Sequence, residues 1–278
     1  MQINKAIIPV AGWGTRRLPI TKVIEKAMLP IGNRPLADYV VEDCAKAGIK
    51  EVYIVIDEKP FSQIKAYYEE NAKLNNYLVA RGKSDKLSLA DTSREGLTIH
   101  FYAQKDVDNR YGSAEPVAQV VKEFGIDEPC VVLMGDDFVY NADGSSDLVR
   151  LMETIEDDSD SAMLAAEIPM EDVERYGVLK VDDGLLSGIY EKPKKEEAPS
   201  NLINISKYIM SAELLQRIVK YCDENDFGPQ DQEYLITDPI IDHIKASGKI
   251  HVLPIKGQYL DGGSMEGWLH ANNVVCGE

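Results

Sequence analysis

Short apolar runs alternate with helix-like segments through the first half of this 278-residue chain. The strand-like runs cover residues 5–10, 51–56, 97–103 and 130–134. Apolar residues recur at helical spacing over residues 35–47, 61–68 and 115–124. Strands that are joined by helices of about ten residues imply right-handed crossovers between parallel neighbours. The first half therefore predicts an α/β fold with a mostly parallel sheet.

From about residue 161 the strand-like runs follow one another more closely. They cover residues 162–168, 178–181, 186–191, 202–210 and 250–255, and helices are predicted at 212–222, 232–246 and 265–273. We interpret this half as a mixed-sheet lobe that completes a single domain over residues 1–278, with the halves meeting near residue 160. The polar stretch at 71–94 is predicted to be an insertion or a mobile loop over the functional site.

The charge of the chain excludes several classes of partner. It carries 30 Lys and Arg against 47 Asp and Glu, a net charge of -17, so it should repel nucleic acid and anionic lipid.

The chain has no apolar run of about 18 residues and no signal-peptide pattern at its N-terminus, which predicts a cytoplasmic protein without a membrane segment. The cysteines lie far apart without a C-x-x-C pair, which predicts buried free thiols. They are Cys44, Cys130, Cys222 and Cys276.

The segment V-A-G-W-G-T-R-R-L-P at residues 10–19 follows the first predicted strand. A glycine turn in that position lets backbone N–H groups approach an anion. A Walker loop is excluded because no Gly-Lys-Ser/Thr follows, and the dinucleotide fingerprint is excluded because Arg17 stands where its third glycine would be. The glycines alone are equally typical of an ordinary turn. With Arg16 and Lys26 nearby, the segment favours a site that clamps a triphosphate.

Three further motifs surround this turn: A-G-x-G-T-R at 11–16, L-P-x-T-K at 18–22 and K-x-M-L-P-I at 26–31. Together they resemble the signature of the sugar-1-phosphate nucleotidylyltransferases, most closely the bacterial UTP–glucose-1-phosphate uridylyltransferases, over almost the whole chain. The resemblance implies a Rossmann-like three-layer α/β/α nucleotide-diphospho-sugar transferase fold. It has a mixed, mostly parallel central sheet, a nucleotide-binding half at about 1–160 and a smaller β-rich sugar-binding half at about 161–278.

The resemblance also implies which residues hold the nucleotide. They are Ala11, Gly12, Gly14, Thr15, Gln104 and Gly112, with Arg16 and Lys26 as catalytic cations at the phosphates. The donor and acceptor of the Gln104 amide suit the mixed edge of uracil. The sequence then departs from the family pattern, because R-Y-G-S-A-E-P at 110–116 replaces Gly-Leu-Gly-His-Ala, and Arg17 and Glu25 are also unusual. The choice between UTP and dTTP therefore stays open.

Two acidic residues follow predicted apolar segments far apart in the chain, Asp136 and Asp261. Magnesium is commonly bound by one or two carboxylates together with phosphate oxygens, and the resemblance implies that this pair holds Mg²⁺. Taken alone, Asp136 or Asp137 could instead cap the next helix.

The resemblance places the sugar 1-phosphate in the second half of the chain. It implies that Gly177, Glu191 and Asn201 bind the sugar and that Lys192 is a third catalytic cation, which holds the sugar phosphate. Taken alone, Glu-Lys-Pro at the end of a strand is more typical of a solvated turn.

A phosphate monoester has a second pKa of roughly 6, so the sugar phosphate can attack the α-phosphorus of the triphosphate without a general base. This fits the histidines, which form no triad or metal motif and are interpreted as structural: His100, His243, His251 and His270. The resemblance implies that the reaction joins UTP and α-D-glucose 1-phosphate into UDP-glucose and pyrophosphate, and that the protein is a homodimer or homotetramer.

Three alternatives to this reaction follow from the same residues. One is transfer from dTTP or to another sugar 1-phosphate, and another is a non-catalytic sugar-nucleotide-binding regulatory protein. A glycosyltransferase is disfavoured because Phe138 interrupts the Asp-x-Asp motif that such an enzyme normally carries.

Overall fold

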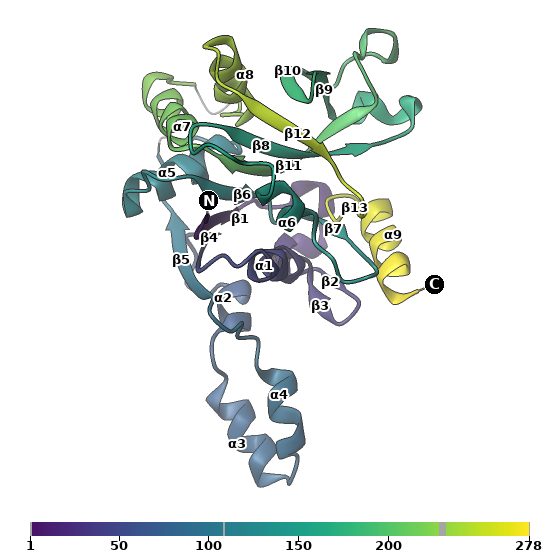
Figure 1. Cartoon of the computed structure of the whole chain (residues 1–278). Coiled ribbons are helices and arrows are strands. Elements are labelled where there is room, and N and C mark those ends of the chain that lie inside the picture. The colour runs from purple at the N-terminus through teal and green to yellow at the C-terminus, as the bar shows by residue number, and fades with distance from the viewer. Residues whose placement is uncertain (1, 108, 228–231, 278) are drawn as a thin grey trace.

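A nine-stranded sheet runs through the whole molecule (Figure 1). The computed structural model describes residues 2–107, 109–227 and 232–277. The strand order is β5-β4-β1-β6-β11-β8-β12-β10-β9. The strands are β1 (Lys5–Pro9), β4 (Glu51–Asp57), β5 (Thr98–Gln104), β6 (Cys130–Leu133), β8 (Ser161–Glu167), β9 (Gly177–Asp182), β10 (Leu185–Glu191), β11 (Leu202–Met210) and β12 (Ile250–Pro254). The predicted α/β class is confirmed.

The sheet is mixed, as predicted, and its parallel pairs lie mainly in the first half of the chain. β5, β4, β1 and β6 pair in parallel, and so do β8 and β12. β11 runs antiparallel to β6 and β8, and β10 runs antiparallel to β9 and β12. Only β10 and β11 run against the other seven strands of this sheet, which agrees with the prediction of a mixed, mostly parallel sheet.

Helices and apolar side chains cover both faces of the sheet. In β1, Ala6 and Ile8 belong to one buried cluster and Ile7 to another, because successive strand residues point to opposite faces. The first cluster includes α1 (Leu36–Lys46) and α6 (Asp147–Met152), and the second includes α5 (Ala114–Phe124), α7 (Ala212–Glu224) and α8 (Thr237–Lys245). Among the described residues, no helix is long and apolar enough to cross a membrane.

The helix predicted at 232–246 begins only at Thr237. The backbone of Tyr234 is engaged elsewhere, since its N–H donates to Tyr111 O (2.9 Å) and its carbonyl accepts from Ala114 N (2.8 Å). These bonds to another segment keep the chain extended before the helix. A second correction concerns the cysteines: Cys276 is exposed, whereas the other three are buried and all four are free thiols.

Two short antiparallel pairs were not anticipated from the sequence. β7 (Asp137–Tyr140) pairs with β13 (Gln258–Asp261), and β2 (Pro30–Ile31) pairs with β3 (Arg34–Pro35). The first pair places Asp137 opposite Asp261, immediately before the closing helix α9 (Met265–Cys276). It thereby joins two segments that are far apart in the sequence.

The polar stretch at 71–94 is a helical arm, so the predicted alternative of a mobile loop over the site is wrong, while that of an insertion stays a prediction. After α2 (Gln63–Tyr68), it forms α3 (Ala72–Ala80) and α4 (Leu87–Ala90), with a 3₁₀ turn between them. The arm projects away from the body (Figure 1), and none of its residues lines the cleft that is described below. Its first helix is capped by Asn71, whose side chain accepts from Leu74 N at 3.0 Å.

Candidate active site

The carboxyl ends of four parallel strands border one cleft of about 920 Å³. Its walls are formed by the segments that follow β1, β4, β5 and β6, where open α/β sheets bind ligands. The turn at 109–113 and Gly263 also line it. Nine of the predicted site residues line this cleft: Ala11, Gly12, Gly14, Thr15, Arg16, Lys26, Gln104, Gly112 and Asp136.

The glycine turn after β1 folds closely over Lys26. Gly14 has a φ of +61°, and a Cβ added there would lie 3.0 Å from Thr21 Cγ2 and 3.1 Å from Lys26 Cβ. The Thr21 hydroxyl donates to Gly14 O at 2.9 Å. Both the backbone angle and the lack of space require glycine at this position, and the contact fixes the turn beside the lysine.

Lys26 and Asp136 form an ion pair at the edge of the cleft. The Lys26 side chain is only 12% exposed, while that of Asp136 is 41% exposed. Burial would raise the pKa of Asp136, but the charges of Lys26, Lys207 and Arg16 outweigh it and lower that pKa. Asp136 is therefore an anion at neutral pH, with a cation against it and its other side open to the cleft.

Asp261 lies beside this pair, although it does not itself line the cleft. Gly262 N donates to Asp136 O at 3.1 Å, and Gly263 N donates to Asp261 Oδ1 at 2.6 Å. A Cβ added to Gly263 would lie 2.8 Å from Asp261 Oδ1 and 3.3 Å from Lys26 Nζ. The structure thus brings the two carboxylates and the lysine together around one glycine.

A buried network of polar side chains lies next to Asp136 and Asp261, in the strands that carry or adjoin them. The Lys207 ammonium pairs with Asp137 and also donates to Met134 O at 2.7 Å, and the Tyr259 hydroxyl donates to Asp137 Oδ2 at 2.9 Å. Lys207 is 4% exposed and Asp137 is 7% exposed. Burial raises the pKa of Asp137 to about 6, and Lys207 opposes the shift. The network connects β11, β7 and β13, the strands that carry or adjoin Asp136 and Asp261.

The alternative that Asp136 or Asp137 caps the next helix is wrong. Ser146 caps α6 instead, because its hydroxyl accepts from Val149 N at 3.4 Å. Lys207 and Tyr259 were missed by sequence reasoning. The signal for Lys207 was a lysine within the apolar run at 202–210, whereas Tyr259 gave no comparable signal.

None of the residues predicted to bind the sugar lines the cleft. Gly177 and Glu191 lie on the β9–β10 hairpin, and Lys192 directly follows it. Gly177 and Glu191 face each other across β9 and β10, and a Cβ on Gly177 would lie 3.1 Å from Glu191 Oε2. Lys192 follows with a φ of +45°, and its N–H donates to Tyr176 O at 3.0 Å. Asn201 lies directly before β11, which also pairs with β9, and its amide donates to Ile168 O at 3.3 Å.

Tyr176 directly precedes β9, at the base of the β9–β10 hairpin. Burial raises the pKa of Tyr176, Arg175 opposes the shift, and the charge of Asp261 adds to it. The base of the β9–β10 hairpin is therefore within electrostatic reach of Asp261.

The far end of the cleft is formed by Gln104 and Gly112. Gln104 ends β5 opposite Asp57, the last residue of β4. Gly112 has a φ of +131°, and a Cβ there would lie 2.5 Å from both N and O of Tyr234. The requirement for glycine at this position comes from the backbone of Tyr234, which packs against it.

The two residues near the glycine turn that depart from the family pattern, Arg17 and Glu25, have structural contacts. Arg17 is buried, donates to Ser264 O and lies 5.3 Å from the Trp268 ring centroid, so it ties the loop to α9. The Glu25 carboxylate accepts from the N–H groups of Gln63 (3.1 Å) and Ile64 (3.0 Å) at the start of α2. Neither residue lines the cleft.

The donor set suits a hard cation that is shared with a ligand. In the described part of the chain, no group of three or more His, Cys, Asp and Glu could hold a metal ion. Asp136 and Asp261 offer two carboxylates, which matches the way Mg²⁺ is held between a protein and phosphate oxygens. None of the four histidines lines the cleft.

The chain belongs to the nucleotidyl transferase family, whose model matches residues 5–276. The resemblance that the motifs indicated is thereby confirmed. The chain is 33% identical over 276 residues to UTP–glucose-1-phosphate uridylyltransferase 1 of Streptococcus pyogenes serotype M3, covering 96% of this chain and 87% of the relative.

Solved structures agree with this membership. The chain resembles a UTP-bound UGPase from Acinetobacter baumannii with a TM-score of 0.85 and 27% identity, over 98% of this chain and 93% of that one. It also resembles a UDP-glucose pyrophosphorylase complexed with UDP-glucose, with a TM-score of 0.78 and 29% identity over 99% of both chains.

Proposed function

We propose that this protein joins UTP and α-D-glucose 1-phosphate into UDP-glucose and pyrophosphate. One observation carries the proposal: Lys26, Asp136 and Asp261 meet beside the glycine turn at the mouth of the cleft. The relatives named for the uridylyl transfer and the UDP-glucose-bound neighbour support the choice of substrates.

In the proposed complex the triphosphate lies along the glycine turn. The segment Ala11–Thr15 directs backbone N–H groups to the phosphates, and Arg16 and Lys26 neutralise their charge. Gln104 reads the edge of the base, and Gly112 forms the wall beside it. All of these residues line one cleft, which is what a single extended nucleotide requires.

The sugar 1-phosphate enters from the wall formed by β9 and β10. Glu191 and Gly177 bind the sugar hydroxyls, Asn201 lies at the edge of that site, and Lys192 holds the phosphate. The phosphate oxygen is already anionic, with a second pKa of roughly 6, so it attacks the α-phosphorus as pyrophosphate leaves. Asp136 and Asp261 would hold Mg²⁺, which when bound neutralises charge on both phosphate groups. The protein's own contribution is alignment and charge neutralisation.

The proposal includes the wider organisation of the protein. It is a single domain of the Rossmann-like three-layer α/β/α type, with a nucleotide-binding half and a smaller sugar-binding half. It works in the cytoplasm as a homodimer or homotetramer. The continuous sheet with helices on both faces supports this organisation.

The test incubates the purified protein with Mg²⁺, glucose 1-phosphate and each nucleoside triphosphate in turn. The measured quantity is the release of pyrophosphate. We expect rapid release with UTP. Release with dTTP and not UTP would move the assignment to thymidylyl transfer. Binding of UDP-glucose without release from any triphosphate would support a regulatory protein instead.

A further inference from the structure

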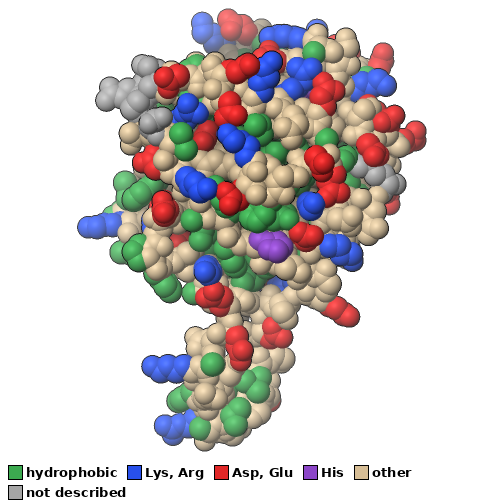
Figure 2. Space-filling view, turned by 90° about the vertical axis from the view of Figure 1, so that its left-hand side faces the viewer, with side chains coloured by type: hydrophobic (Ala, Val, Ile, Leu, Met, Phe, Trp, Pro, Cys, Tyr) green, Lys and Arg blue, Asp and Glu red, His purple; other side chains and the backbone are tan. Residues whose placement is uncertain are grey.

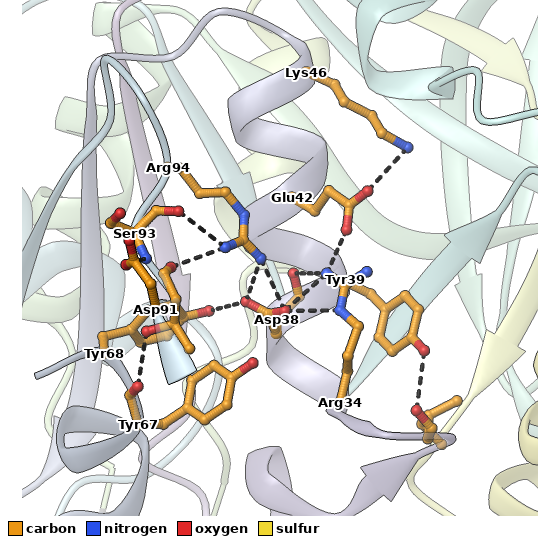
Figure 3. Close-up of polar contacts among 12 residues, drawn as sticks. Arg34, Asp38, Tyr39, Glu42, Lys46, Tyr67, Tyr68, Asp91, Ser93 and Arg94 are labelled. Carbon is orange, nitrogen blue, oxygen red and sulfur yellow. Dashed lines mark hydrogen bonds and ion pairs between the residues drawn. The ribbon is translucent and has the colours of Figure 1, made fainter. Parts of the chain in front are cut away.

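Charged side chains of the body and of the arm's base lie among groups of opposite charge. Figure 2 shows acidic and basic side chains interspersed over one face of the body. At the base of the arm, the Asp38 carboxylate is 1% exposed and accepts from Arg34 Nε (2.8 Å) and Arg94 Nη2 (3.0 Å) (Figure 3). The Tyr68 hydroxyl donates to the same carboxylate at 2.8 Å. These groups satisfy one another without a ligand, whereas a large aromatic side chain in the cleft stays uncovered.

Trp13 presents this uncovered surface. The residue lines the cleft, and its side chain is 69% exposed. It occupies the variable position of the A-G-x-G-T-R motif, so the motif assigns it no role. Aromatic side chains bury roughly 150–250 Å² each when they are covered, and ligand pockets are lined mainly by apolar and aromatic groups. An indole exposed inside a cleft therefore indicates a surface that a ligand covers.

The segment after β4 holds the indole in place. Lys59 Nζ lies 4.8 Å from the centroid of the Trp13 ring, a distance at which a cation is attracted to the face of an aromatic ring. The same ammonium pairs with Asp57 at 2.9 Å, and Lys59 N donates to Asp57 O at 2.9 Å. Lys59 does not line the cleft. The cation therefore contacts the ring from outside the cavity and leaves its exposed surface to the cavity.

The strand order shows which end of the cleft the indole faces. β4 lies between β1 and β5, so the contact with Lys59 turns Trp13 toward β5 and away from β6. Gln104 ends β5 opposite Asp57, whereas Asp136 follows β6. The ring thus lies on the side of the glutamine that is proposed to read the base, and not on the side of the Lys26–Asp136 ion pair.

We propose that the base of the bound nucleotide stacks on the indole of Trp13. The inference rests on the proposed function, because it requires a nucleoside triphosphate in the cleft. Stacking on an aromatic side chain adds affinity whatever the base, since every base has a π-face. Trp13 supplies affinity for the nucleotide, while Gln104 supplies the choice among bases.

The test measures the steady-state constants of full-length variants by pyrophosphate release. Trp13→Ala should raise KM for UTP at least about fivefold. Stacking is present in the ground state and the transition state alike, so kcat and KM for glucose 1-phosphate should stay within about twofold of the wild type. Trp13→Phe keeps a ring and should lose less. Phe61→Ala is the matched control, because Phe61 is 66% exposed after β4 but does not line the cleft, and it should behave as the wild type does.

Tryptophan fluorescence gives a second measurement that needs no turnover. The chain has two tryptophans, Trp13 and Trp268. UTP with Mg²⁺ and without glucose 1-phosphate should quench the emission of the wild type, because a stacked base quenches an indole. The emission of Trp13→Phe, which keeps only Trp268, should change little.

A rise of less than about fivefold in KM for UTP in a folded Trp13→Ala protein would overturn the proposal, and so would a quench that persists in Trp13→Phe. Melting temperatures equal to that of the wild type establish that the variants are folded. Calorimetric titration of the wild type with UTP separates this failure from that of the proposed function. Binding and turnover that do not depend on Trp13 would refute the stacking alone, whereas a wild type that binds no UTP would refute both.

Discussion

Replacing Lys26 by methionine removes the ammonium that pairs with Asp136 at the cleft while keeping most of the side-chain volume. In the proposed complex the Lys26 ammonium also faces a phosphate charge of the triphosphate, and two unit charges 4 Å apart interact by about 4 kcal/mol at an effective dielectric constant near 20 and by about 1 kcal/mol in water. The Lys26 side chain is only 12% exposed, which favours the larger value. At about 1.4 kcal/mol for each factor of ten, kcat/KM should fall by about a thousandfold.

The assay is pyrophosphate release over a range of UTP and glucose 1-phosphate concentrations. Lys26→Arg keeps the charge and should retain more activity than Lys26→Met. Lys65→Met is the matched control, because Lys65 is 49% exposed on α2 and lies outside the cleft lining. It should behave as the wild type does.

Stability separates a catalytic role from a structural one. The Asp136 side chain is 41% exposed. Breaking the Lys26–Asp136 ion pair should therefore cost at most about 1 kcal/mol of unfolding free energy. A folded Lys26→Met protein with kcat/KM within about threefold of the control would refute the assignment of Lys26 to the phosphates.

Three further predictions concern the framework around the site. Lys207→Met leaves the Asp137 carboxylate buried without its cation and should lower the free energy of unfolding, measured in urea, by about 3–5 kcal/mol. The double variant Lys207→Met/Asp137→Asn should recover at least half of that loss. An equal loss in both variants would contradict the ion-pair argument. Gly112→Ala forces a Cβ to 2.5 Å from the Tyr234 backbone, whereas Gly125 has a φ of +60° and nothing within 4 Å. The first substitution should therefore cost about 3 kcal/mol or more and Gly125→Ala about 1 kcal/mol, and equal melting temperatures would disprove the close contact. Burial raises the pKa of Asp43, in α1, from 3.8 to about 6. The folded state therefore holds this proton more tightly than the unfolded chain does. Ionised Asp43 then destabilises the folded state increasingly as the pH rises from about 4 to 6. Asp43→Asn should leave stability almost unchanged near pH 4 and raise it by about 3 kcal/mol above pH 6, and a constant difference across that range would exclude Asp43 as the titrating group.

The convergence of Gln104, Asp136 and the glycine turn on one cleft was predictable because they follow regular strands. Each apolar run of the first half ends at the same edge of a parallel sheet, so the residues after β1, β5 and β6 had to converge. The family motifs added Lys26, and the structure places it against Asp136. Local pattern and strand polarity together were sufficient for this half of the site.

The arm was mispredicted because composition was given more weight than local signals. The stretch at 71–94 is rich in polar residues, which favoured a loop. It nevertheless contains Asn71 at a capping position, and Leu74 and Leu78 lie four residues apart on one helical face. Those two signals were present in the sequence and predict the helix that the structure contains.

The contacts of Asp137 with Lys207 and Tyr259 depend on the register of the β7–β13 pair, which the sequence did not reveal. β7 and β13 have four residues each, and their pairing joins Asp137 to Asp261 across more than a hundred residues. A shift of one residue in that ladder would turn Asp137 away from Lys207, because successive side chains point to opposite faces. Lys207 in turn ties β11 to the β6–β7 turn by donating to Met134 O. The motif therefore identifies which acids stand in the site, while a buried lysine and a short ladder outside every motif determine how far apart they are held.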